Sequence, residues 1–224
     1  MKAYLLFIII ALSVNIATSQ AVIQTGFGIQ QNKFMGQQYE IDSLAIAPRR
    51  IFDDPGVSFH LLYNHKINNK IYVEAGLKYY TIFNTYYVGQ LHPDFGYIKK
   101  VGFVKATTFN IPVNFEYHLK NKIYLVAGLS SSIAILKKRK DFHFNDTPAV
   151  DRLYNEAKHM FKPAFLNYGL GVGYRIWRID VSYLYSNSIT EISDPLKYDG
   201  NAYLVFQGLE IHHFVLSYFF QIKK

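Results

Sequence analysis

The feature that most constrains this fold is an alternation of apolar and polar residues that recurs in eight separate segments. In residues 71–79 (IYVEAGLKY) the odd positions are apolar, and the even positions are polar, small or tyrosine. Because successive side chains of a strand point to opposite faces, this pattern indicates β-strands with one apolar and one polar face. The predicted strands are 23–29, 57–63, 71–79, 109–117, 123–130, 166–176, 179–186 and 214–222. The chain is therefore predicted to be all-β.

The composition excludes several other classes of protein. The chain has 224 residues and no cysteine, which fits one large domain and rules out disulfide scaffolds and cysteine-ligated zinc. Half of the residues are hydrophobic and 17% are aromatic, too many for a disordered protein. Only the N-terminus approaches the length of a membrane-spanning helix, so a polytopic helical membrane protein is excluded as well.

The N-terminal segment resembles an export signal. Met1 and Lys2 precede an apolar run over residues 3–17, and the small residues Ala17 and Ser19 stand before Gln20. This layout is typical of a secretory signal peptide, and a retained anchor helix is the alternative. The run is short and a processing site follows it, so residues 1–19 are predicted to be the signal peptide and residues 20–224 the exported domain.

Export limits the partners of the chain. Cleavage removes one lysine from the 24 basic residues, so the mature chain carries 23 basic and 16 acidic residues, a net charge of +7. An exported protein does not meet genomic DNA, so no nucleic-acid partner is expected. The basic excess instead favours a membrane surface or an acidic partner.

The connections between the predicted strands alternate between short and long. The short ones lie near 68–69, 120–122 and 177–178, and the long ones are 31–55, 85–102, 137–162 and 190–207. Short periplasmic turns and long outer loops are typical of bacterial membrane barrels. The prediction is an eight-stranded antiparallel transmembrane β-barrel in the outer membrane, with four long outer loops as a mobile crown and a short helix near 150–161.

Aromatic residues gather near the predicted strand ends, as in the girdles of outer-membrane barrels. A general preference of aromatic residues for strands explains their number but not these positions. The girdle residues expected at the outer end are Tyr79, Tyr80, Phe83, Tyr86 and Tyr87, and those expected at the other end are Tyr63, Tyr117, Trp177, Phe219 and Phe220.

Four segments carry a resemblance to a known family. They are Gly26–Gly28 (GFG), Ile111–Tyr117 (IPVNFEY), Tyr124–Leu129 (YLVAGL) and Ser182–Tyr185 (SYLY). Together they resemble the Bacteroidota-type outer-membrane β-barrel domain family, which includes a barrel subunit of the gliding-associated secretion system. The resemblance implies an eight-stranded barrel and a role in the cell envelope, and it carries over no catalytic residue.

The polar face contains charged residues that would line the barrel interior near the short turns. A barrel of eight strands is just wide enough for its own side chains to fill it. Two carboxylates at similar depth, Glu74 and Glu116, can be interpreted as an acid–base pair or as members of a buried ion network, and the need to pair buried charges favours the network. The predicted lumen network comprises Glu74, Lys78, Glu116, His118, Arg175 and Asp180.

The strongest local charge feature is the basic run Lys137, Lys138, Arg139 and Lys140, where the fifth strand leaves the membrane. This run can bind lipopolysaccharide phosphates or an acidic partner, or it can simply end the apolar band as a solvated rim. The eight histidines show no metal-ligand spacing, and the glycines of residues 169–173 alternate along a strand instead of opening a nucleotide-binding helix. No cofactor, metal or catalytic residue is predicted.

Three functions remain open. The first is a non-enzymatic structural or interaction barrel of the cell envelope, in contact with outer-membrane lipid and lipopolysaccharide and including a subunit of a secretion machine. The second is an enzyme that modifies outer-leaflet lipids, for which Ser186, Ser188, His92 and His143 are available. The third is a soluble periplasmic β-barrel that binds a ligand.

Overall fold

The computed structural model describes residues 21–41, 44–48, 55–92, 96–119, 122–138, 148–157 and 160–221. The signal peptide predicted over residues 1–19 lies outside these ranges. None of the helices within them is long and apolar enough to cross a membrane. The strands of the barrel are β1 (Ala21–Gly36), β4 (Gly56–Lys66), β5 (Ile71–His92), β6 (Gly96–His118), β7 (Ile123–Lys138), β8 (Ala164–Ile176), β9 (Ile179–Ser188) and β12 (Phe206–Gln221).

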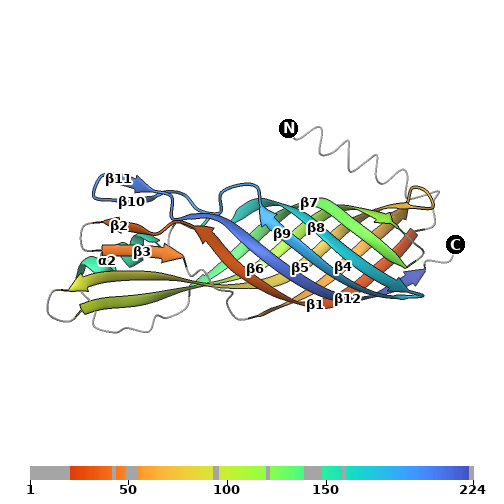
Figure 1. The fold of residues 1–224 in the computed structure, drawn as a ribbon, viewed down its shortest axis with the longest axis horizontal. Coiled ribbons are helices and arrows are strands. Elements are labelled where there is room, and N and C mark those ends of the chain that lie inside the picture. The colour runs from red at the N-terminus through yellow and green to blue at the C-terminus, as the bar shows by residue number, and fades with distance from the viewer. Residues whose placement is uncertain are drawn as a thin grey trace.

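These eight strands form a closed antiparallel barrel (Figure 1). Each strand pairs with its neighbour in the chain order of the barrel, and β1 pairs with β12 to close the wall, from Val22 opposite Gln221 to Gly36 opposite Phe206. All eight strands predicted from the alternation are present. The prediction of an eight-stranded antiparallel barrel is confirmed.

The alternation sorts side chains between the two surfaces of the wall. On β4 the residues Val57, Phe59 and Leu61 point outward and are more than half exposed, whereas Ser58 and His60 are buried. The other barrel strands expose apolar residues in the same way, and Leu129 and Phe214 each keep 61% of their surface exposed. So continuous an apolar belt is unfavourable in water and favourable in contact with lipid tails. The surface does not fit a soluble barrel.

The two ends of the barrel differ. The connections between β4 and β5, between β6 and β7 and between β8 and β9 are short and lie at one end, where β1 begins and β12 ends. At the other end the connections contain β2 (Tyr39–Ile41), β3 (Leu44–Pro48), α2 (Pro148–Ala157), β10 (Leu196–Tyr198) and β11 (Asn201–Tyr203). Figure 1 shows these elements gathered beyond the barrel rim, and we call this region the crown.

One predicted outer loop is instead regular structure. Residues 85–92 and 96–102 continue the paired strands β5 and β6, in which pairing runs from Ile71 opposite Tyr117 to His92 opposite Gly96. β3 adds to the edge of this pair by pairing with β5. The prediction of a loop over 85–102 is wrong because the β-favouring residues of this segment continue the ladder after the lipid-facing alternation has ended.

The described part of the crown is folded around an apolar core, contrary to the prediction of mobile loops. Barrel strands and crown elements both contribute side chains to this core, so it joins the crown to the rim of the barrel. We call it the crown core. Its buried members are Phe34, Leu44, Ile46, Tyr80, Val88, Ala134, Leu153, Met160, Phe165, Ile192, Leu196, Tyr198, Val205, Phe206, Leu209 and Ile211.

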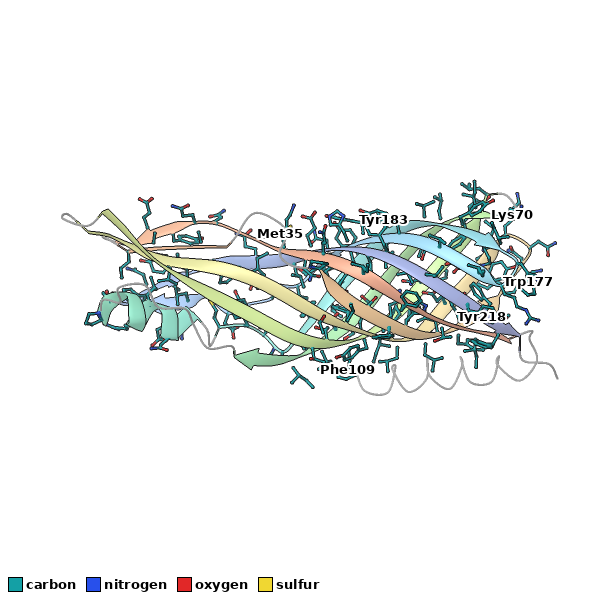
Figure 2. The ribbon with its side chains drawn as sticks, turned by 90° about the horizontal axis from the view of Figure 1, so that it is seen from below. Met35, Lys70, Phe109, Trp177, Tyr183 and Tyr218 are labelled. Carbon is teal, nitrogen blue, oxygen red and sulfur yellow. The ribbon has the colours of Figure 1, made fainter. Side chains whose placement is uncertain are left out.

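The aromatic residues divide between the two faces. Tyr117, Trp177 and Phe220 point outward near the short turns, and Figure 2 shows Trp177 at that end of the molecule. Tyr80 and Phe219, both expected in the girdles, point inward instead and are buried. Their positions follow from the two-residue period of the strands, because the residues on either side of Phe219 lie on the lipid-facing surface. The side chains of Phe83, Tyr86 and Tyr87 lie outside the described parts.

Candidate functional site

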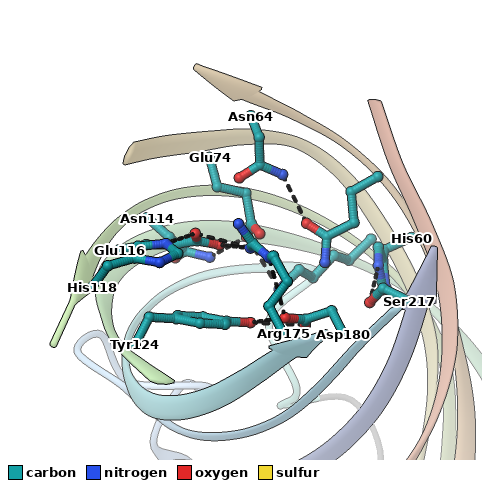
Figure 3. Close-up of polar contacts among 12 residues, drawn as sticks. His60, Asn64, Glu74, Asn114, Glu116, His118, Tyr124, Arg175, Asp180 and Ser217 are labelled. Atoms are coloured by element: carbon teal, nitrogen blue, oxygen red, sulfur yellow. Dashed lines mark hydrogen bonds and ion pairs between the residues drawn. The ribbon is translucent and has the colours of Figure 1, made fainter. Parts of the chain in front are cut away.

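Arg175 lies at the centre of a charged cluster in the lumen near the short turns (Figure 3). Its Nη2 donates hydrogen bonds to both carboxylate oxygens of Glu116, at 3.1 and 3.0 Å. Its Nε lies 3.5 Å from Oδ1 of Asp180, and the Nε2 atom of His118 lies 3.2 Å from Glu116. Glu116 and Asp180 are buried, so the guanidinium provides the positive charge that both carboxylates require in the interior.

Aromatic rings enclose the same guanidinium. The Cζ atom of Arg175 lies 4.1 Å from the ring centroid of Phe219, 4.9 Å from that of Tyr124 and 6.0 Å from that of Tyr72. Cations are attracted to the faces of such rings, and the attraction is stronger away from water. The strand period is the signal that could have placed Phe219 here, although its aromatic character alone suggested a girdle.

Tyr124 connects the two sides of the cluster. Its hydroxyl donates to the carboxylate of Asp180, with both oxygens at 2.7 Å. A Cβ atom added at Gly173 would lie 2.1 Å from Cζ of this ring, so Gly173 leaves the space that Tyr124 occupies. One of the lumen glycines is therefore required by the packing of a neighbouring side chain.

The remaining charged residues of the predicted network lie on the same side of the lumen. Glu74 accepts a hydrogen bond from Asn114 Nδ2 at 2.7 Å, and the Nζ atom of Lys78 lies 3.9 Å from the same Glu74 oxygen. Glu74 and Glu116 thus have separate partners. This arrangement is that of paired buried charges and does not provide the shared proton of an acid–base dyad.

The lumen also contains polar contacts outside the charged cluster, and the sequence does not reveal them. His213 Nε2 lies 2.5 Å from Ser58 Oγ, and His60 Nε2 lies 3.2 Å from Ser217 Oγ. Ser132 forms contacts with three side chains: Asn110 and Asn167 donate to it at 2.9 and 2.8 Å, and Tyr80 lies 3.0 Å away. These pairs join residues up to 157 positions apart, so no local sequence signal could identify them.

Buried polar side chains pack against one another in the described part of the lumen, and a cavity of about 30 Å³, lined in part by Gln30, Lys78 and Asn167, lies among them. A volume of this size accommodates one or two water molecules and no organic substrate. The crown core covers the outer mouth above it, where the rings of Phe34, Phe161 and Phe206 pack with centroids 4.9 to 5.3 Å apart.

A second polar cluster lies on the outer surface, where the apolar belt ends on β1, β9 and β12. Glu210 contacts two basic side chains, with 2.8 Å from Oε2 to Nζ of Lys33 and 2.8 Å from Oε1 to Nε2 of His212. The Nδ1 atom of His212 lies 2.6 Å from the hydroxyl of Tyr183. We call this chain of contacts the rim cluster. The adjacent His213 points into the lumen, as expected for neighbouring strand residues.

The other predicted site residues are not brought into a described site. Lys137 and Lys138 end β7, but their side chains lie outside the described parts, as do Arg139 and Lys140 entirely. Ser186 and Ser188 lie at inward-facing positions of β9, and Ser188 Oγ accepts a hydrogen bond from the backbone N–H of Leu209. Among the described residues, no group of three or more histidine, aspartate or glutamate side chains is arranged to hold a metal ion.

Comparisons with known proteins return structures only. The sequence matches no family profile. It also matches no curated protein. Similar solved structures include the outer membrane protein OprG from Pseudomonas aeruginosa, with a TM-score of 0.49, 10% identity and coverage of 91% of this chain and 98% of that chain.

Two further solved structures show comparable overlap. Ail of Yersinia pestis, in complex with the heparin analogue sucrose octasulfate, has a TM-score of 0.42, 12% identity and coverage of 90% and 99%. Neisserial surface protein A has a TM-score of 0.42, 10% identity and coverage of 90% and 97%. TM-scores this low support no conclusion about the class of this protein.

The barrel defines that class. It is closed, its outer surface is an apolar belt, its interior is polar and filled, and its connections are short at one end and long at the other. These are the properties of an outer-membrane β-barrel. The chain is an outer-membrane β-barrel protein, in contact with lipid through its belt, with the short turns on the periplasmic side and the crown outside the cell.

Proposed function

We propose that this protein is a non-enzymatic barrel that anchors a folded crown on the cell surface, where the crown contacts other envelope components. The proposal rests on the absence of an open channel through the described barrel. Side chains pack in the lumen, and the crown core lies over its outer mouth. A barrel of this kind does not conduct ordinary solutes. Its specific surface outside the membrane is the crown.

A finer proposal is that the crown binds partners within a protein secretion machine. It rests on the resemblance of four strand segments to the Bacteroidota-type barrel family, which includes a secretion subunit. The folded state of the crown supports it, because an ordered surface binds a partner without the entropic cost of ordering loops. The short turns provide much less surface for such contacts.

Removal of the protein tests this proposal directly. In a deletion strain we expect unchanged outer-membrane lipid composition, together with reduced amounts of secreted protein in the culture medium. Purification of the protein after photo-crosslinking from Tyr203 in β11 should recover an envelope partner, whereas crosslinking from Asn69 in a periplasmic turn serves as the matched control. Normal secretion with no crosslinked partner would contradict the secretion proposal.

A second candidate function, an enzyme that modifies outer-leaflet lipids, is favoured by the rim cluster. A hydroxyl, an imidazole and a carboxylate in sequence form the kind of chain in which one group activates the next. Tyr183, His212 and Glu210 make such a chain at the level where the apolar belt ends. In this test the deletion strain is complemented with either the wild-type protein or the His212→Ala variant, and its lipids are analysed. A lipid species that is missing from the deletion strain, and that only the wild-type protein restores, would support the enzymatic function and contradict the non-enzymatic one.

We also propose that the basic run of residues 137–140 contacts lipopolysaccharide. Phosphates accept charge-assisted hydrogen bonds from lysine and arginine, and each cation near an anionic surface contributes about 1 kcal/mol.

Reversal of the four charges to glutamate is therefore expected to weaken lipopolysaccharide binding by at least tenfold, measured with the protein in phospholipid nanodiscs at low salt. Glutamate at Lys197 and Lys162, two cations elsewhere in the outer region, is the control. Unchanged binding after reversal of 137–140 would contradict the contact.

A further inference from the structure

An apolar groove crosses the lipid-facing wall where β1, β4, β9 and β12 meet. Its volume is about 450 Å³, and the outward side chains along it are Thr25, Phe27, Phe59, Ile179, Leu216 and Tyr218. Tyr218 pairs with Ile179, which follows directly after the turn at 177–178. The groove therefore begins at the periplasmic edge of the belt and extends toward its middle.

A cation lies at the periplasmic end of this groove. Arg178 Nη1 donates to the hydroxyl of Tyr218 at 3.2 Å, and its guanidinium lies 5.1 Å from the ring centroid of Trp177. Figure 2 shows Tyr218 and Trp177 at the end of the barrel that also holds Lys70 in a periplasmic turn. Within the described ranges no carboxylate lies within ion-pair distance of Arg178, whereas Arg175 has two.

The two features have complementary chemistry. The groove lies in the part of the wall that faces hydrocarbon, so its natural occupant is an acyl chain. A guanidinium has five N–H donors. Among the residues that the structure describes, one oxygen acceptor, the Tyr218 hydroxyl, accepts a hydrogen bond from the Arg178 guanidinium. The free donors match the oxygens of a phosphodiester, which guanidinium groups bind through paired hydrogen bonds.

We propose that the groove and Arg178 bind one anionic glycerophospholipid of the periplasmic leaflet. An acyl chain lies along Phe27, Phe59 and Leu216. The phosphodiester is bound by Arg178, and Trp177 lies at the level of the glycerol backbone, where tryptophan is enriched in membrane proteins. This site is separate from the crown and from the basic run of residues 137–140.

The single tryptophan of the chain makes the site measurable. The full barrel is reconstituted in phosphatidylcholine vesicles that contain phosphatidylglycerol brominated near the carbonyl end of its chains, and quenching of Trp177 fluorescence gives the association constant relative to phosphatidylcholine. We expect a preference of roughly fivefold for phosphatidylglycerol, the effect of one cation near the bilayer surface. Arg178→Gln should reduce the preference to about one.

Two controls separate the groove from simple charge attraction. Lys122→Gln removes a cation from another periplasmic turn and should keep the preference. Thr25→Phe fills the groove and should abolish the preference although Arg178 is intact, whereas Val113→Phe, on the lipid face of β6, should not. Heat-modifiable migration on a gel verifies that each variant is folded.

Four results would overturn the proposal. The first is equal quenching by the two lipids in the wild type. The second is a preference that survives Arg178→Gln. The third is a preference that survives Thr25→Phe, because the arginine would then attract anionic headgroups without a bound chain. Protection of Trp177 from both brominated lipids would indicate a protein occupant and would also contradict lipid binding.

Discussion

Replacement of Arg175 with alanine is expected to destabilise the folded barrel by about 3–5 kcal/mol, because removal of one partner leaves buried charges uncompensated. The guanidinium contacts Glu116 and Asp180, both of which are buried, and its own side chain is only 15% exposed. The free energy of unfolding can be measured by urea titration in lipid vesicles. Wild-type stability of this variant would show that the charges of the lumen do not form an energetically coupled network.

A matched control and a rescue define the cause of this effect. Arg178→Ala removes an exposed arginine three residues away and should change the stability by less than about 1 kcal/mol. If Arg175→Ala does not fold at all, the triple variant Arg175→Met, Glu116→Gln and Asp180→Asn should recover folding, because it removes the unpaired carboxylates together with the cation. Failure of the triple variant would indicate that packing around Arg175, and not charge, is what the barrel requires.

Replacement of Phe206 with alanine is expected to cost the crown about 3–5 kcal/mol of local stability, the usual cost of truncating a buried phenylalanine. Phe206 is fully buried, and its ring lies 4.9 Å from the rings of both Phe34 and Phe161. The variant should show faster amide hydrogen exchange and faster proteolysis in β10, β11 and α2. The barrel should keep its heat-modifiable migration, because lumen contacts and the lipid-facing belt do not involve Phe206.

Phe214→Ala is the control for this variant. Phe214 lies on the same strand, but it points toward lipid and is 61% exposed. Its truncation should leave hydrogen exchange in the crown unchanged. A crown that remains equally protected in Phe206→Ala would contradict the role of the crown core, and loss of the whole barrel would show that crown and barrel unfold as one unit.

The barrel wall could be predicted from the sequence because lipid and lumen impose opposite requirements on alternate residues. The segments 109–117 and 166–176 show this most plainly, and both are strands in the structure. The outward and inward faces of β8 follow the predicted parity from Leu166 to Arg175. The positions of Glu116, Arg175 and Asp180 near the short turns follow from the same parity, since their strands are joined there.

The crown could not be predicted in this way because no lipid enforces the alternation above the rim. Residues 190–207 contain Ile192, Leu196 and Phe206, which are buried in the crown core, but their spacing fits no single period. The outer parts of β5 and β6, residues 85–92 and 96–102, have no lipid-facing pattern for the same reason. The contacts Ser58–His213 and His60–Ser217 depend on which strands become neighbours, and closure between β1 and β12 decides that.

Strands β5 and β6 extend far beyond the membrane on the outer side of the barrel. The two strands contain 22 and 23 residues, a contour of roughly 70 Å at the usual rise per residue. A tilted strand needs only about 10 residues to cross the hydrocarbon core, so more than half of each strand stands outside the bilayer. The described ends of these strands, His92 and Gly96, therefore stand far beyond the hydrocarbon core on the outer side, so a macromolecule that contacts them does not need to approach the lipid tails.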